Sequence, residues 1–166
     1  MITLTSADSR AHSDWFYEVS MGLLDKDVLA ASEPVHFTGK LTPSVSLGIG
    51  HTSQLAPNWK WDNVISLSHA QTSHVASILE NGELTGGQLD NTGIWLDSRI
   101  VYTGLFERVS PFVSVGVGKI YGQYNDTTLS RSGWETATRA FIGAEYQLTD
   151  DTSISLALGH AETGDL

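Results

Sequence analysis

Apolar and polar residues alternate along seven stretches of this chain, and a period of two residues predicts β-strands. In residues 14–23, Trp15 and Tyr17 fall on one face of the strand, whereas Glu18 and Ser20 fall on the other. The same alternation predicts strands at residues 35–51, 59–70, 93–106, 111–121, 134–148 and 153–160. The sequence therefore predicts an all-β, antiparallel fold.

The connections between these strands alternate in length. Short turns are expected at residues 54–58, 107–110 and 149–151, and longer polar loops at residues 25–34, 71–91 and 122–133. Within the second of these loops, residues 73–79 could instead extend a strand or form one helical turn. A membrane-spanning antiparallel barrel has this arrangement, because its short turns lie on one side of the bilayer and its long loops on the other. We therefore expect an up-and-down transmembrane β-barrel.

The polar faces of the strands contain mainly Ser, Thr, Gly and Ala, with a few charged residues between them. The outside of a soluble barrel carries more Lys, Glu and other large solvated groups. Small residues and paired charges suit a narrow interior instead, where eight strands leave room for side chains but for no wide pore. We expect a network of interior charges at Glu18, Asp97, Arg99, Glu135, Arg139 and Glu145.

On the apolar faces, aromatic residues concentrate near both ends of the strands, with aliphatic residues between them. Aromatic girdles at the two membrane interfaces have this distribution. The band at the short-turn ends is predicted to contain Trp15, Tyr17, Trp59, Trp61, Tyr102, Phe106 and Tyr146. The band at the loop ends is predicted to contain Phe37, Tyr121 and Trp134. Aromatic residues also populate the strands of soluble proteins, so a soluble antiparallel barrel or sandwich stays open as an alternative.

Composition narrows the choice of class and partner. A length of 166 residues indicates a single domain, and no apolar stretch approaches the roughly 20 residues of a transmembrane helix. The chain has no Cys, which excludes disulfides and zinc–thiolate sites. Its net charge is −10 and its nine Lys and Arg residues are scattered, so we expect no nucleic-acid partner.

The pattern over residues 14–160 resembles the small eight-stranded outer-membrane β-barrels, which include the outer-membrane protein A transmembrane domain and the general outer-membrane β-barrel domain family. The hairpin at residues 143–151 (GAEYQLTDD) is similar to a recurrent penultimate hairpin of that family. The resemblance implies eight strands, so the seven visible ones predict that the chain stops in the last extracellular loop, without the last strand. Residues 1–13 would then be an N-terminal extension or partial strand, and residues 14–166 a single barrel domain. In a less favoured interpretation, residues 1–5 form the closing strand.

Histidines are the candidates for metal binding or catalysis. His69, His74 and His160 are predicted near the loop ends of strands, but no tight His pair or carboxylate cluster accompanies them, so we expect no metal and no cofactor. Lipid A deacylases are also eight-stranded outer-membrane barrels, and resemblance to them would imply a His-x-Ser pair on the penultimate strand. His160 has the required strand and face, but Glu162 occupies the serine position. Without a hydroxyl nucleophile the Ser–His mechanism cannot operate, so we expect no enzymatic activity.

These observations predict a small barrel of the bacterial outer membrane with a structural or surface-interaction role and at most narrow-pore activity. The expected partners are outer-membrane lipid and lipopolysaccharide, together with extracellular molecules that the loops contact. We expect a monomer. The alternatives are a soluble antiparallel barrel that binds a small apolar ligand, and an outer-membrane esterase of the lipid A deacylase type.

Overall fold

The computed structural model of the chain describes residues 2–7, 15–24, 35–37, 42–78, 84–125 and 130–163. The described residues form nine β-strands and their short turns, which confirms the all-β prediction. The strands are β1 (Ile2–Ala7), β2 (Trp15–Leu24), β3 (Val35–Phe37), β4 (Thr42–Ala56), β5 (Trp59–Ile78), β6 (Leu84–Tyr102), β7 (Val109–Asn125), β8 (Ser130–Thr149) and β9 (Thr152–Thr163). Among these residues, no helix is long and apolar enough to cross a membrane.

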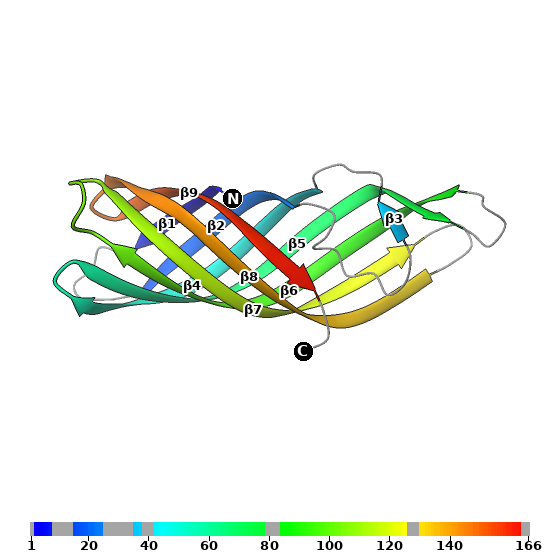
Figure 1. The fold of residues 1–166 in the computed structure, drawn as a ribbon, viewed down its shortest axis with the longest axis horizontal. Coiled ribbons are helices and arrows are strands. Elements are labelled where there is room, and N and C mark those ends of the chain that lie inside the picture. Colours follow the sequence, from blue (N-terminus) through cyan, green and yellow to red (C-terminus); the bar gives the residue numbers. More distant parts are fainter. Residues whose placement is uncertain are drawn as a thin grey trace.

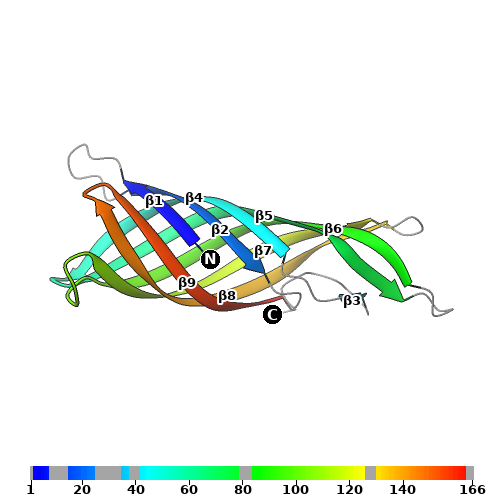
Figure 2. The same ribbon diagram turned by 90° about the horizontal axis from the view of Figure 1, so that it is seen from above.

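All nine strands belong to one antiparallel sheet that curls into a barrel-like wall (Figures 1 and 2). Along the sheet the order is β3-β5-β4-β2-β1-β9-β8-β7-β6, and β5 also pairs with β6. Strand β1 pairs with β2 on one side and with β9 on the other. Pairing between neighbours therefore continues around the wall, and the wall encloses an interior.

Two strand predictions differ from the structure near the N-terminus. Strand β1 lies between β2 and β9, the position that the less favoured interpretation gave to residues 1–5. The predicted strand at residues 35–51 is divided, because β3 pairs with the far end of β5, whereas β4 pairs with β2 and β5. Alternation alone cannot reveal such a division, since both pieces keep a strand-like pattern.

The long loop predicted at residues 71–91 is wrong for most of its length, whereas the alternative in which residues 73–79 extend a strand agrees with β5 as far as Ile78. Strand β5 continues to Ile78 and β6 begins at Leu84, so the two form a hairpin that extends past the ends of the neighbouring strands (Figure 1). A register shift between Thr72 and Val75 separates the barrel part of this hairpin from the extension. The segment contains too little patterned apolar content for alternation to predict strands over its whole length.

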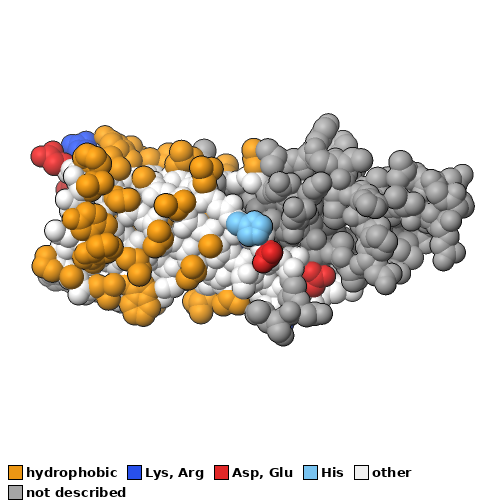
Figure 3. Space-filling view, in the orientation of Figure 1, with side chains coloured by type: hydrophobic (Ala, Val, Ile, Leu, Met, Phe, Trp, Pro, Cys, Tyr) orange, Lys and Arg blue, Asp and Glu red, His pale blue; other side chains and the backbone are white. Residues whose placement is uncertain are grey.

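The wall has an apolar outer face and a mixed, largely polar inner face. Leu158 is 76% exposed and Ile142 66% exposed on the outside, whereas Asp97 and Arg99 are 7% and 6% exposed on the inside. Hydrophobic side chains are spread over the described part of the face in Figure 3, and charged ones lie at its left end and beside the grey region. The faces assigned from alternation are therefore the faces of the structure, with the apolar side turned outward.

Candidate functional site in the barrel interior

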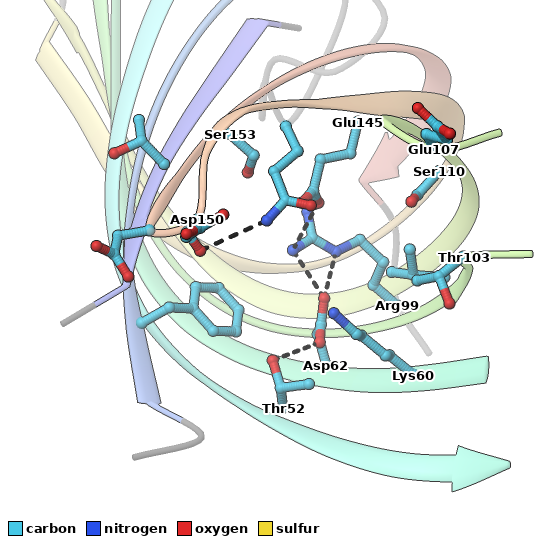
Figure 4. A pocket seen from close by; sticks show the side chains of 15 residues that line it. Thr52, Lys60, Asp62, Arg99, Thr103, Glu107, Ser110, Glu145, Asp150 and Ser153 are labelled. Carbon is cyan, nitrogen blue, oxygen red and sulfur yellow. Dashed lines mark hydrogen bonds and ion pairs between the residues drawn. The ribbon is translucent and has the colours of Figure 1, made fainter. Parts of the chain in front are cut away.

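One guanidinium connects four strands in the middle of the interior. Strand β6 turns Arg99 inward, where its Nε and Nη2 donate to Asp62 Oδ2 of β5 at 3.0 and 2.8 Å. Its other contacts are with Glu18 of β2 at 3.6 Å and with Glu145 of β8 at 3.9 Å. Thr52 on β4 donates its hydroxyl to Asp62 at 2.8 Å (Figure 4). Three carboxylates thus converge on one buried cation, which offsets the cost of placing it away from water.

A second ion pair lies nearby and depends on a glycine. Asp97 on β6 and Arg139 on β8 are both paired across the sheet with Gly116, which lies between them on β7. Because Gly116 has no side chain, Arg139 Nε reaches Asp97 Oδ1 at 2.7 Å, and Nη2 contacts the other carboxylate oxygen. Arg139 Nη2 also donates to Ser66 on β5 at 3.3 Å. A bidentate contact of this kind holds both side chains in a fixed orientation.

Buried aromatic rings fill the space around the two arginines. The guanidinium carbon of Arg139 lies 4.2 Å from the centre of the Trp95 ring, and that of Arg99 lies 5.2 Å from the Phe112 ring. Both rings lie across from glycines: a Cβ atom on Gly118 would be 2.6 Å from Trp95, and one on Gly143 would be 2.7 Å from Phe112. Large residues face glycine across the strands, and cation–π contacts add to the ion pairs.

The two arginines and their partners divide the interior into two cavities. The cavity nearer the short turns, which we call the turn-end cavity, has a volume of about 250 Å³ and is lined by Lys60, Asp62, Arg99, Glu107, Glu145 and Asp151 (Figure 4). The loop-end cavity has a volume of about 210 Å³ and is lined by Ser20, Asn91, Trp95, Ile120, Arg139 and Ala161, among others. Between them, the space bordered by Glu18, Asp97, Arg99, Phe112 and Arg139 measures only about 30 Å³. That volume is about the share of a single water molecule in the liquid, so the centre is a constriction.

The predicted charge network is brought together in large part. Glu18, Arg99 and Glu145 meet in one cluster, and Asp97 and Arg139 meet in the other. Glu135 is half-buried on β8, across from Ile120, and lies outside these two clusters.

Asp62 was missing from the predicted network, although it makes the shortest contact with Arg99. Its position on the polar face of the predicted strand at residues 59–70 was a sufficient signal for its inward direction. What alternation could not supply was the cross-strand register, in which Asp62 and Arg99 are directly paired.

The predicted aromatic girdle lies mainly on the outer face. Tyr102 and Tyr121 are half-buried because their rings contact neighbouring aromatic rings, at centroid distances of 4.7 Å to Trp59 and 5.2 Å to Trp134. Phe106 is exposed in the turn after β6 rather than on a strand, and the side chain of Phe37 on β3 lies outside the described part. The members with exposed side chains on strands are Trp15, Tyr17, Trp59, Trp61, Trp134 and Tyr146.

The histidines form no cluster in the described part of the chain. His160 is on the outward face of β9, and its Nε2 lies 3.9 Å from the Glu162 carboxylate, at the position where a deacylase would carry serine. His69 Nδ1 lies 3.3 Å from the Thr92 hydroxyl, and the side chain of His74 is outside the described part. The described residues contain no group of three or more His, Asp or Glu residues with the geometry of a metal site.

Comparison of the chain with protein-family models, with curated proteins and with solved structures finds no match in any of the three.

Proposed function

We propose that the protein is a small, monomeric barrel of the bacterial outer membrane with a structural or surface-interaction role, at most narrow-pore activity and no catalytic activity. In this proposal β1, β2, β4, β5, β6, β7, β8 and β9 are the eight strands of the membrane-spanning wall. The observation that carries the proposal is the inversion of the wall, with large apolar side chains outside and ion pairs inside.

The inversion favours lipid over water as the surroundings. Leu23, Leu67, Val115, Leu156 and Leu158 are each at least 60% exposed, and they come from four different strands. Transfer of such a side chain from water to an apolar medium contributes about 1.5–3 kcal/mol, so the free energy at stake over the whole wall is large. A soluble monomer rarely exposes an apolar surface of this extent, whereas a transmembrane barrel requires it.

The central constriction supports the limit on pore activity. A path along the interior has to pass the region between Arg99 and Arg139, where only about 30 Å³ is free. Both side chains are fixed by ion pairs and by aromatic contacts. We therefore expect the native protein to pass water-sized species at most, and we assign contacts with lipopolysaccharide to the outer face and contacts with extracellular molecules to the loops.

Tryptophan quenching tests the location of each face. Four of the five tryptophans, Trp15, Trp59, Trp61 and Trp134, are exposed on the outer face, and Trp95 is buried in the interior. In variants that keep a single tryptophan, brominated lipid in reconstituted vesicles is expected to quench Trp61 strongly. The Trp95-only variant is the matched control and is expected to be quenched only weakly.

The same preparation separates the alternatives. A protein that stays folded and monomeric without detergent, and in which brominated lipid quenches no tryptophan, would refute the membrane proposal in favour of a soluble ligand-binding barrel. Release of fatty acid from lipid A, abolished by His160→Ala, would refute the non-enzymatic part and support the esterase alternative. Fatty-acid release that persists in the His160→Ala variant would come from a contaminant.

A further inference from the structure

We propose that the loop-end cavity is a binding site for a small molecule with an apolar body and one neutral polar group that both donates and accepts a hydrogen bond, such as a carboxamide. This function goes beyond a structural or surface-interaction role. Three features of the cavity carry the inference: a buried side chain with both polar atoms unpaired, walls that are largely apolar, and an available volume of suitable size.

Asn91 is the polar group that points to a ligand. It projects from β6 into the cavity, between Ala70 on β5 and Gly122 on β7, and it is 6% exposed. Neither Nδ2 nor Oδ1 has a hydrogen-bond partner in the protein, and among the described residues Asn91 is the one side chain with buried polar atoms that lack a partner. Buried polar groups are nearly always paired, so an amide with a free donor and a free acceptor is suited to a ligand that supplies both complements.

The walls determine the rest of the ligand. Trp95, Ile120, Phe141 and Ala157 provide apolar surface. A cavity of about 150 Å³ with apolar walls is large enough for benzene, so about 210 Å³ accommodates a six-membered ring or a short alkyl chain with a small polar group. The cavity also extends to Met21 and Leu158, which face outward on β2 and β9, so an apolar molecule has contact with the apolar outer surface.

The charge of the ligand follows from the state of Arg139. This arginine lines the cavity, but its guanidinium already contacts both carboxylate oxygens of Asp97, donates to Ser66 and stacks on Trp95. Its charge is thereby compensated within the protein. A carboxylate ligand would gain little from it and would lose its hydration, so a neutral amide is favoured over an acid anion.

Calorimetric titration of the full chain in lipid nanodiscs tests the site with two probes, benzamide and toluene, after subtraction of the signal from empty nanodiscs. Benzamide is expected to bind saturably and more tightly than toluene. Asn91→Leu is expected to weaken benzamide binding about tenfold, because it removes two neutral hydrogen bonds, and to change toluene binding by less than about twofold. The matched control is Asn63→Leu, which changes the same residue type on the outward face of β5 and is expected to change neither affinity.

Two further variants keep the test decisive. Asn91→Ser retains a small polar side chain and serves if the leucine variant does not fold; it is also expected to weaken benzamide binding. Ala161→Phe fills the cavity and is expected to abolish the binding of both probes. Absence of saturable benzamide binding to the native protein would mean that the cavity holds water only and would overturn the proposal, as would an unchanged ratio of benzamide to toluene affinity in the Asn91 variants. Neither result bears on the tryptophan quenching, so the membrane location and the binding site are tested separately.

Discussion

Replacement of Arg99 by methionine tests whether the interior charges act as one structural unit. Methionine keeps most of the length of the side chain and removes the charge. Arg99 is 6% exposed and contacts three carboxylates, two of them on strands that do not neighbour β6 in the sheet. The substitution leaves Asp62, Glu18 and Glu145 without their common cation, so it exposes like charges to one another in a confined space.

The magnitude follows from the cost of unpaired buried charge. Removal of one partner of a buried ion pair typically destabilises a protein by about 3–5 kcal/mol, and we expect Arg99→Met to lie in this range. Asp62→Asn in the same background is expected to recover part of the loss, with a coupling energy of about 1–3 kcal/mol, because it removes one of the uncompensated carboxylates next to the substituted position.

Urea-induced unfolding in lipid vesicles, followed by tryptophan fluorescence, measures these free energies. The matched control is Arg108→Met, since Arg108 is an exposed arginine in the turn between β6 and β7. Surface substitutions usually change stability by less than about 0.5 kcal/mol. If Arg99→Met and Arg108→Met have equal effects, or if Asp62→Asn adds to the loss instead of reducing it, the description of Arg99 as the centre of a carboxylate cluster is wrong.

The remaining predictions concern packing, the constriction, the outer face and Asn91. Gly118→Ala is expected to destabilise the protein by about 1–3 kcal/mol in urea unfolding, because the new Cβ atom would overlap the Trp95 ring, whereas Gly133→Ala has open space and is expected to be nearly neutral. Arg139→Ala is expected to widen the constriction and produce a small, cation-selective conductance in planar bilayers, since four carboxylates then face one arginine. Val115→Lys, at a position that is 62% exposed on β7, is expected to cost about 2–4 kcal/mol in vesicles. Asn91→Leu is expected to raise the unfolding free energy by about 1 kcal/mol in the absence of ligand, because it removes two unpaired buried polar atoms.

Each of these outcomes can be contradicted by a single measurement. Equal effects of the two glycine substitutions would mean that Trp95 has room to move. An Arg139→Ala variant with no conductance above that of the native protein would place the barrier elsewhere. A neutral Val115→Lys would show that β7 faces water, because a lysine in an aqueous environment costs nothing there. A destabilised Asn91→Leu would show that hydration already satisfies Asn91.

Alternation in the sequence was sufficient to assign both faces of most strands, because a shift of one residue would move every side chain of a strand to the opposite face. It was therefore possible to expect Arg99, Arg139 and Asp97 in the interior and Trp61 on the outside. Alternation was not sufficient for the hairpin past residue 71. Its apolar residues are too irregularly spaced to decide between a loop, a strand extension and a helical turn, and the pairing of β5 with β6 shows the strand. The division of β3 from β4 also follows from pairing partners and not from local pattern.

The candidate site depends on a further level of information, the register between strands. Two rows across three neighbouring strands illustrate this. Asp97, Gly116 and Arg139 form one row of β6, β7 and β8, and Trp95, Gly118 and Ala137 form the next. In each row a side chain from β6, either Asp97 or Trp95, lies over a glycine on β7, so the glycines decide which residues can meet. Alternation places all six residues in the interior but does not place them in rows, because register is set by pairing along the full strands. The constriction is therefore a property of register and of glycine position together, because Asp97 and Arg139 meet over Gly116. Gly118→Ala tests the same principle in the neighbouring row, where the Trp95 ring lies over a glycine.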